Sequence, residues 1–240
     1  MAQFFGKPSW YLDFNKKIAK LSSLYFLFCL LFIIDFILIK FPNYLIHIFG
    51  WISIIIVCGP PAVICYILYK YFDKRYIKFN QGKKGEGSVC YELHKLSDDY
   101  LVFQDINLAG HGNIDFVVVG PSGIFTVEVK SHKGVIGFNG TELTKNGHTF
   151  KERNFLDQAM AETLSVNSFL KNQIRVDFFV EPVIVFSSFL ARLKFSFNKQ
   201  KNVYVINKRI LIKLILSQPK LLSTEQINIV KDILYKKINV

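Results

Sequence analysis

Cysteine is scarce in this sequence, and its spacing excludes the chemistry that cysteine usually supports. Four cysteines occur among 240 residues, three of them in an apolar N-terminal region: Cys29, Cys58, Cys65 and Cys90. Neither a CxxC pair nor a Cys/His ligand spacing is present, so the sequence predicts no zinc site and no disulfide framework. A thiol in apolar surroundings behaves as a small hydrophobe, and we expect a reducing compartment.

Several nucleotide and nucleic-acid signatures are also absent. The chain has no P-loop, no helix-turn-helix signature and no aromatic RNP pattern, so sequence-specific readout and nucleotide-driven motion are not supported. Positive charge, in contrast, is in excess. Residues 71–240 hold 24 Lys and Arg against 16 Asp and Glu, a net charge of +8. This balance suits an anionic partner, either a nucleic acid or a phospholipid surface.

The N-terminal part of the chain is far more apolar than the rest, and two runs within it predict membrane spans. Residues 21–39 and 44–69 are nearly uncharged, and only KFPN separates them. Each run is long enough to cross a hydrocarbon core about 30 Å thick. We therefore expect a two-helix transmembrane hairpin over 21–69 that inserts into the lipid bilayer. Asp35 and Pro60-Pro61 within it could instead mediate assembly with other spans.

Flanking charges predict the orientation of this hairpin. Four lysines precede the first run and six basic residues follow the second, whereas the connecting loop offers only Lys40. By the positive-inside rule both termini lie in the cytoplasm, as expected for a two-pass protein of the inner (cytoplasmic) membrane. The predicted order is a cytoplasmic segment over 1–20, the hairpin over 21–69, a basic linker over 70–84 and a cytoplasmic domain over 85–240.

Periodicity in residues 85–240 predicts an α/β fold, an α+β arrangement with one mixed sheet. A helix is expected from Gly85, with Glu86 in its first turn where an acid suits the helix dipole. Ser223 and Gln226 fit a capping box at the start of the last helix. Strands are expected at 100–107, 113–120, 124–130, 181–188 and 202–207, and helices at 154–170, 208–216 and 223–238. Two shorter strands are expected in GVIGFNG (134–140) and TELTKNGHTF (141–150), the second of which contains an Asn146-Gly147 turn.

The two central strands carry charged residues in apolar surroundings: NIDFVVVGPSGIFTVEVK, residues 113–130, holds Asp115, Glu128 and Lys130. If Pro121-Ser122 form the turn, Asp115 faces Glu128 with Cβ atoms about 4.5–5.5 Å apart, although a bulge at Gly123 would shift this register. Facing carboxylates repel, and a hard cation resolves the conflict.

We therefore expect Mg2+ (or Mn2+) here, held by Asp115, Glu128 and the carbonyl of Val129. Lys130 shares a strand face with Glu128 and could orient a water, lower its pKa or stabilise a phosphate. The alternative is an ion pair on a solvated face, which the apolar flanks disfavour.

Three motifs in this region, GKKGEG, NIDFVVVGPSGIFTVEVKSHKGVIG and NFLDQA, follow the order of the nuclease-related (NERD) domain, which the chain resembles over about 82–189. That domain resembles the restriction-endonuclease-like PD-(D/E)XK fold. The resemblance implies a core of order αβββαβ behind the transmembrane hairpin. It also implies metal-dependent nuclease activity. One departure is that Ile114, not proline, precedes Asp115.

The resemblance also implies roles for individual residues. Asp115 and Glu128 look like the metal-binding acids and Lys130 like the catalytic lysine. Glu86 resembles an acid that assists the metal, and Gln158 a polar residue that reaches the phosphate or the water. Two plainer roles remain open, a helix-dipole role for Glu86 and a capping or packing role for Gln158.

Less specific candidates lie nearby. His111 and His132 could touch a phosphate, although each fits a solvated loop residue better. Three dispersed basic residues could face DNA or simply keep the domain soluble: Lys133, Lys151 and Arg153.

The sequence thus predicts a membrane-anchored, metal-dependent nuclease-like protein that acts on DNA rather than RNA. The alternative is a catalytically silent module that binds nucleic acid or protein at the membrane. A homodimer formed through the hairpin is a further option that no residue decides.

Overall fold

A computed structural model describes residues 1–6, 27, 31, 50–108, 113–151, 153–195 and 198–238. The chain divides into two compact units. One comprises Met1–Ser9 with Gly82–Val240, and the other comprises Trp10–Gln81. The described part of the second unit is helical and belongs mainly to α3 (Gly50–Leu93), whose last residues belong to the first unit.

No helix among the described residues is both long and apolar enough to cross a membrane. The first predicted span, 21–39, lies outside the described residues except for Leu27 and Leu31, and Asp35 lies outside them as well. The second predicted span is helical from residue 50 onward, and α3 continues through Pro60-Pro61 without ending there. The two-span hairpin stays a prediction.

Helix α3 corrects two expectations from the sequence. The basic segment 70–84 is helical throughout, so the helix that carries Glu86 does not begin at Gly85. Glu86 lies about two turns before the helix ends at Leu93, where the N-terminal dipole offers it nothing. Glycine lowers helix propensity, but the packing of Val89 and Leu93 in the core outweighs that effect.

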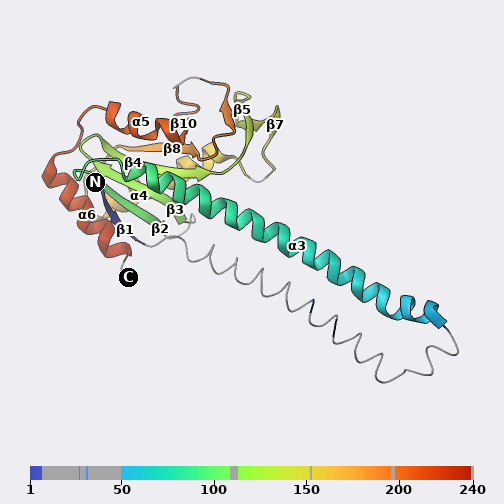
Figure 1. The fold of residues 1–240 in the computed structure, drawn as a ribbon. Helices are drawn as coiled ribbons and strands as arrows, with labels where there is room; N and C mark the ends of the chain where they lie inside the picture. The colour runs from blue at the N-terminus through green and yellow to red at the C-terminus, as the bar shows by residue number, and fades with distance from the viewer. Residues whose placement is uncertain are drawn as a thin grey trace. The chain divides into compact units, whose positions relative to one another are not determined.

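A six-stranded mixed sheet forms the centre of the first unit (Figure 1). Its strand order is β1-β2-β3-β4-β8-β10, which confirms the predicted fold class. The neighbours β2, β3 and β4 are antiparallel to one another in sequence order. Strand β1 runs parallel to β2, and the neighbours β4, β8 and β10 are also parallel. The strands are β1 (Gln3–Phe5), β2 (Leu101–Asn107), β3 (Asn113–Gly120), β4 (Gly123–Lys130), β8 (Val180–Phe186) and β10 (Tyr204–Asn207).

The register of the central hairpin is the one expected without a bulge. Gly120 pairs with Gly123, and Phe116 pairs with Val127. Continued by one residue, this register sets Asp115 opposite Glu128.

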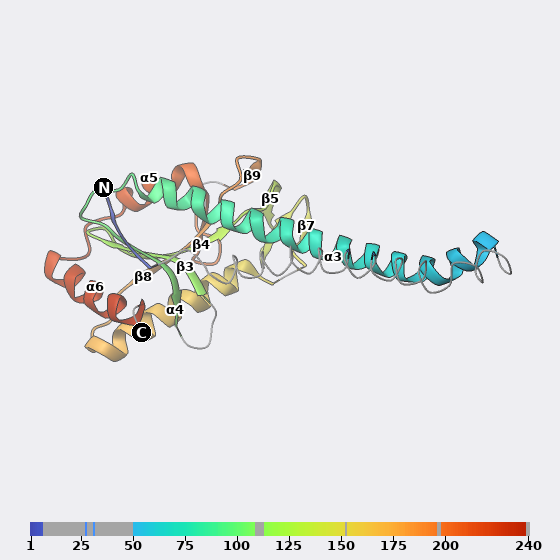
Figure 2. The same ribbon diagram turned by 60° about the horizontal axis from the view of Figure 1, so that its bottom comes forward.

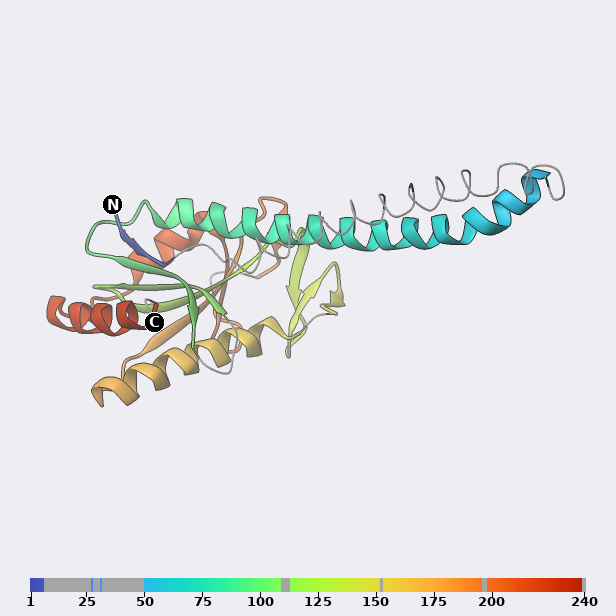
Figure 3. The same ribbon diagram turned by 90° about the horizontal axis from the view of Figure 1, so that it is seen from below.

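Helices cover both faces of the main sheet, as Figure 3 shows. The end of α3 and α5 (Leu211–Ser217) pack on one face, and a short 3-10 turn, η2 (Lys208–Ile210), leads into α5. On the other face lie α4 (Phe155–Ile174) and α6 (Thr224–Ile238). Both faces of the sheet are therefore buried, which is why its strands read as continuous apolar runs.

A smaller sheet of order β7-β6-β5-β9 adjoins the main one (Figure 2). The predicted turn at Asn146-Gly147 connects two of its strands, and both turn residues have positive φ, 52° and 86°. The sheet packs through Ile136 against Phe155 at the start of α4. Its strands are β5 (Gly134–Phe138), β6 (Leu143–Lys145), β7 (His148–Thr149) and β9 (Ala191–Leu193).

The sequence did not predict β1, because residues 1–20 were assigned to a separate segment. Three residues carry too little periodicity to mark a strand, and the partner strand lies almost a hundred residues away. The ladder is extended by the N–H of Gln3, which donates to the Tyr100 carbonyl at 3.0 Å, and Phe5 stacks on Phe103. The predicted capping box is confirmed, because the Ser223 N–H donates to the Gln226 side chain at 2.9 Å.

Two glycine-to-alanine substitutions should have opposite effects on stability. A Cβ at Gly120 would fall on the ring of Tyr100, whose hydroxyl is bound to Ser122 at 2.9 Å. Gly120→Ala should destabilise the protein by about 1–3 kcal/mol, the usual range for overpacking. Gly87→Ala, in α3 with open space around it, should stabilise it by up to about 1 kcal/mol. Thermal unfolding followed by circular dichroism checks both, and equal shifts would contradict the packing described here.

Candidate active site

The five side chains predicted to form the site come from four elements of the first unit. Asp115 lies on β3, Glu128 and Lys130 lie on β4, Gln158 lies on α4, and Glu86 lies on α3. Hydrogen bonds join Glu128, Lys130 and Gln158 directly. Asp115 and Glu86 lie close enough to Glu128 for its charge to raise the pKa of both.

A closed network links the lysine, the glutamine and one acid. Lys130 Nζ donates to Glu128 Oε1 at 2.7 Å and to Gln158 Oε1 at 3.1 Å. Gln158 Nε2 donates to the same Glu128 oxygen at 2.8 Å. Because lysine can only donate and an ionised carboxylate can only accept, the two partners fix the orientation of the Gln158 amide. Lys130 Nζ also lies 4.2 Å from the centroid of the Phe155 ring.

Asp115 is tied to the strand that carries Glu128. Its Oδ2 accepts a hydrogen bond from the N–H of Val129 at 2.7 Å. Val129 therefore takes part in the site through its N–H, while the metal-binding role expected for its carbonyl stays a prediction. The bond holds the Asp115 carboxylate beside the end of β4.

Burial, and then the crowding of like charges, raises the pKa values of two of these acids. Burial raises the pKa of Asp115 well above its usual range, and the charges of Glu128 and Glu86 raise it further. The pKa of Glu86 rises to about 7, first because of burial, then because of Asp105 and Glu128. The nearby Lys83 lowers it in part.

The structure adds Asp105, which the sequence reasoning missed. It lies on β2, where the register continues to a position opposite Asp115, and its φ of 53° is unusual for a residue other than glycine. Asn113 Nδ2 donates to Asp105 Oδ1 at 2.7 Å, and burial raises the pKa of this acid. The sequence signal that could have identified Asp105 is its position as an acid in the middle of an apolar strand.

Glu162 is the second acid that was missed. It lies one turn after Gln158 on α4, is 2% exposed, and accepts a hydrogen bond from Gln158 Nε2 at 2.7 Å. Burial, then the charge of Glu128, raises its pKa to about 8. The sequence signal that could have identified Glu162 is its spacing of four residues from Gln158, which places both side chains on the same face of a helix.

The side chains gathered here offer carboxylate oxygens, the donor type that a divalent cation such as Mg2+ prefers. Within the described residues, Glu128 Oε2 is buried and has no hydrogen-bond partner, and repulsion among Asp115, Glu86 and Glu128 favours a cation. No three His, Cys, Asp or Glu side chains among the described residues form a group that could hold a metal ion. A cation would thus depend on one or two carboxylates, with main-chain oxygen and water completing its shell.

The structure tests the predicted position of only one of the two histidines. His132 is not a solvated loop residue as expected, because its ring packs against Phe150 and Phe155 at centroid distances of 4.9 and 5.5 Å. His111 lies outside the described residues.

Comparison with known protein families supports the resemblance to the nuclease-related domain. Residues 81–187 match the family model of the nuclease-related domain, NERD. The NERD match begins in α3 and ends just after β8, so it contains all five predicted site residues as well as Asp105 and Glu162. It supports a nuclease-related function at the level of the family. The chain matches no curated protein and no solved structure.

Glu162 gives the NERD region a stability that depends on pH. The carboxyl ionises near 4.5 when unperturbed and near 8 in the folded protein. Between these values the folded state keeps a proton that the unfolded chain has lost, so stability falls as pH rises through this window. Glu162→Gln keeps an oxygen for Gln158 but carries no charge. In EDTA at pH 7.5, the melting temperature of the variant should be higher than that of the wild type. Near pH 4.5 the two melting temperatures should be equal.

The matched control is Glu225→Gln, an exposed position on α6. A Glu162→Gln variant that melts below the wild type at pH 7.5 would show that the charged form is stabilising, against this assignment.

Proposed function

We propose that this protein is a membrane-anchored, metal-dependent nuclease that hydrolyses phosphodiester bonds, in DNA rather than RNA. The proposal is supported by the NERD match over 81–187 and by the acids and lysine gathered at the end of β4. The order α3-β2-β3-β4-α4-β8 supports the restriction-endonuclease-like PD-(D/E)XK core that the resemblance implies, with the short strands β5, β6 and β7 inserted between β4 and α4.

One observation carries the proposal. Lys130 and Glu128 form an ion pair of 2.7 Å at the carboxyl end of a central strand, with side chains only 13% and 8% exposed. A purely structural ion pair would need one acid for one lysine. Here Asp115 and Glu86 crowd against the same pair, at the expense of their own ionisation. Such an excess of buried acid is typical of a site that binds a cation.

Asp115 and Glu128 would hold this cation, Mg2+ or Mn2+, with the Val129 carbonyl as a third protein ligand. When bound, it supplies charge neutralisation at the phosphate and lowers the pKa of a coordinated water. Glu86 would support it from α3, either through water or at a second position.

Lys130 stabilises negative charge in this mechanism. Its ammonium group donates hydrogen bonds to the attacking water or to a non-bridging phosphate oxygen, where negative charge increases in the transition state. Gln158 holds Lys130 through its amide oxygen and is itself held by Glu162. The water oxygen bonds to phosphorus, the phosphorus–oxygen bond to the leaving alcohol breaks, and one proton of the water ends on that alcohol.

The membrane anchor and orientation complete the proposal. The apolar runs at 21–39 and 44–69, with basic residues on their outer flanks, support a two-pass anchor with both termini and the nuclease domain in the cytoplasm. DNA near the membrane would then be the substrate, and a homodimer through the hairpin is compatible with this arrangement.

A catalytically silent module is the second candidate. The closed network of Lys130, Glu128 and Gln158 favours it, because every member already has a partner within the protein. Such a module would bind nucleic acid or protein at the membrane without cutting.

A cleavage assay tests the proposal. Full-length protein in a non-ionic detergent is incubated with linear and circular double-stranded DNA, single-stranded DNA and RNA, in Mg2+, in Mn2+ and in EDTA. We expect cutting of DNA that requires the metal. Glu128→Gln and Lys130→Ala should each lower the initial rate by about 100-fold or more, the usual effect of removing such groups.

Lys236→Ala, an exposed lysine on α6, is the matched control and should cut like the wild type. Cutting in both site variants at the wild-type rate would remove these residues from the mechanism. DNA binding without any cutting, by folded wild-type protein, would favour the silent module.

A further inference from the structure

A long segment after the acid cluster carries charge of one sign only. Residues 182–224 contain eight Lys or Arg and no Asp or Glu. One of the eight, Lys199, pairs with Glu181 at 2.8 Å. The NERD match ends at 187, so most of this segment lies beyond the part of the chain that the family describes.

Sheet topology brings part of this segment to the edge that holds the candidate active site. Lys130 on β4 pairs with Phe186 on β8, and Phe186 pairs with Asn207 on β10. The three strands are parallel and end together. Neighbouring strands lie about 4.8 Å apart, so Asn207 lies about 10 Å from Lys130 along this row, and Lys208 and Arg209 follow Asn207 directly in the chain.

Strand β9 and the residue that follows it carry two more basic side chains. Ala191 and Leu193 pack inward against the core, so Arg192 and Lys194 share the outward face. The Ser188 carbonyl accepts hydrogen bonds from the N–H of Ala191 at 3.1 Å and from Asn207 Nδ2 at 3.4 Å. These bonds fix the start of β9 against the end of β10.

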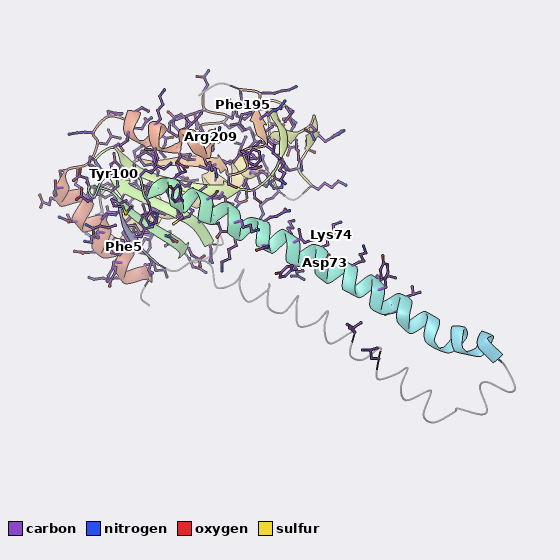
Figure 4. The ribbon with its side chains drawn as sticks, in the orientation of Figure 1. Phe5, Asp73, Lys74, Tyr100, Phe195 and Arg209 are labelled. Carbon is purple, nitrogen blue, oxygen red and sulfur yellow. The ribbon has the colours of Figure 1, made fainter. Side chains whose placement is uncertain are left out.

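We define the basic strip as Arg192, Lys194, Lys208 and Arg209 (Arg209 is labelled in Figure 4). Lys208 is half-buried, and the other three are exposed. Within the described residues, these four side chains make no hydrogen bond or ion pair that would neutralise them. Four uncompensated cations, two after β10 of the main sheet and two on and after β9 of the smaller sheet, attract a polyanion.

We propose that the basic strip binds the phosphates of a nucleic acid next to the phosphodiester bond addressed by the acid cluster. This inference rests on the proposed nuclease function. Asp115, Glu128 and Glu86 repel a polyanion, so the site needs cations close by to bring the substrate in. The strip supplies them without reading sequence, because phosphate groups are the same at every base.

A nucleic acid fits this surface better than an anionic bilayer does. Lys194 borders a cavity of about 620 Å3 that is also lined by Asn146, Gln200, Phe138 and Phe195. A flat membrane surface would leave such a hollow empty, whereas a nucleic acid can place a sugar or a base there. Aromatic rings beside cations are the usual features of nucleic-acid grooves.

The test measures how salt weakens DNA binding, without cleavage. Full-length protein in a non-ionic detergent and EDTA is titrated into a fluorescent DNA duplex at a series of salt concentrations, with anisotropy as the signal. The slope of log K against log salt changes by about 0.9 for each phosphate that the protein no longer neutralises. Lys194→Gln and Arg209→Gln should each reduce the slope by about that amount, and the double variant by the sum. Lys236→Gln on α6 is the matched control and should leave it unchanged.

The outcomes separate this inference from the proposed function. An unchanged slope in the folded double variant overturns the proposed role of the basic strip in DNA binding, even if the wild type cuts DNA. A reduced slope supports the strip, and it does so even if the wild type shows no cutting, in which case the nuclease proposal alone fails. Loss of binding to anionic phosphatidylserine vesicles in the double variant, with the DNA slope unchanged, would assign the strip to the membrane and also overturn the inference.

Discussion

The repulsion among carboxylates at the end of β4 is the constraint on which the account of this site depends. Glu128 is 6% exposed, and the pKa values of its neighbours Asp115 and Glu86 are both raised, first by burial and then by nearby acids that include Glu128. Burying several acids together destabilises a protein unless protons, a lysine or a cation offset their charge. Lys130 offsets one charge, and the others remain. This remaining charge is the basis for the proposed cation site.

The fold places this cluster at the carboxyl end of a central strand. The parallel strands β4, β8 and β10 end at one edge, and α4 covers the sheet face beside them. Glu162 and Gln158 extend the network from that helix toward Lys130. The same edge leads to the basic strip, so attraction for phosphate and the groups that would cleave it lie next to each other.

Much of this arrangement could be predicted from the sequence, because its signals are local. The turn at Pro121-Ser122 fixed the register of β3 and β4, and thereby the approach of Asp115 to Glu128. The capping box at Ser223 marked the start of α6 within one residue. Alternating and continuous apolar runs also predicted the central strands, because these patterns are local as well.

The features that escaped prediction depend on contacts between distant parts of the chain. Residues 3–5 become a strand only because β2 offers a free edge, and α3 continues through Gly85 because its next turns are buried. Glu162 and Asp105 read as ordinary polar residues until folding brings them to Gln158 and Asp115. Asp105 also adopts a positive φ that no sequence pattern announces.

Stabilisation by Mg2+ tests the central claim most directly. A ligand that binds only the folded state raises its stability in proportion to the logarithm of ligand concentration over Kd, once that ratio exceeds one. The melting temperature of the full-length protein at pH 7.5 should rise when EDTA is replaced by millimolar Mg2+. Asp115→Asn, which removes a carboxylate from the cluster, should lose most of that rise. Equal melting temperatures of the wild type in EDTA and in Mg2+ would contradict a cation site at these acids.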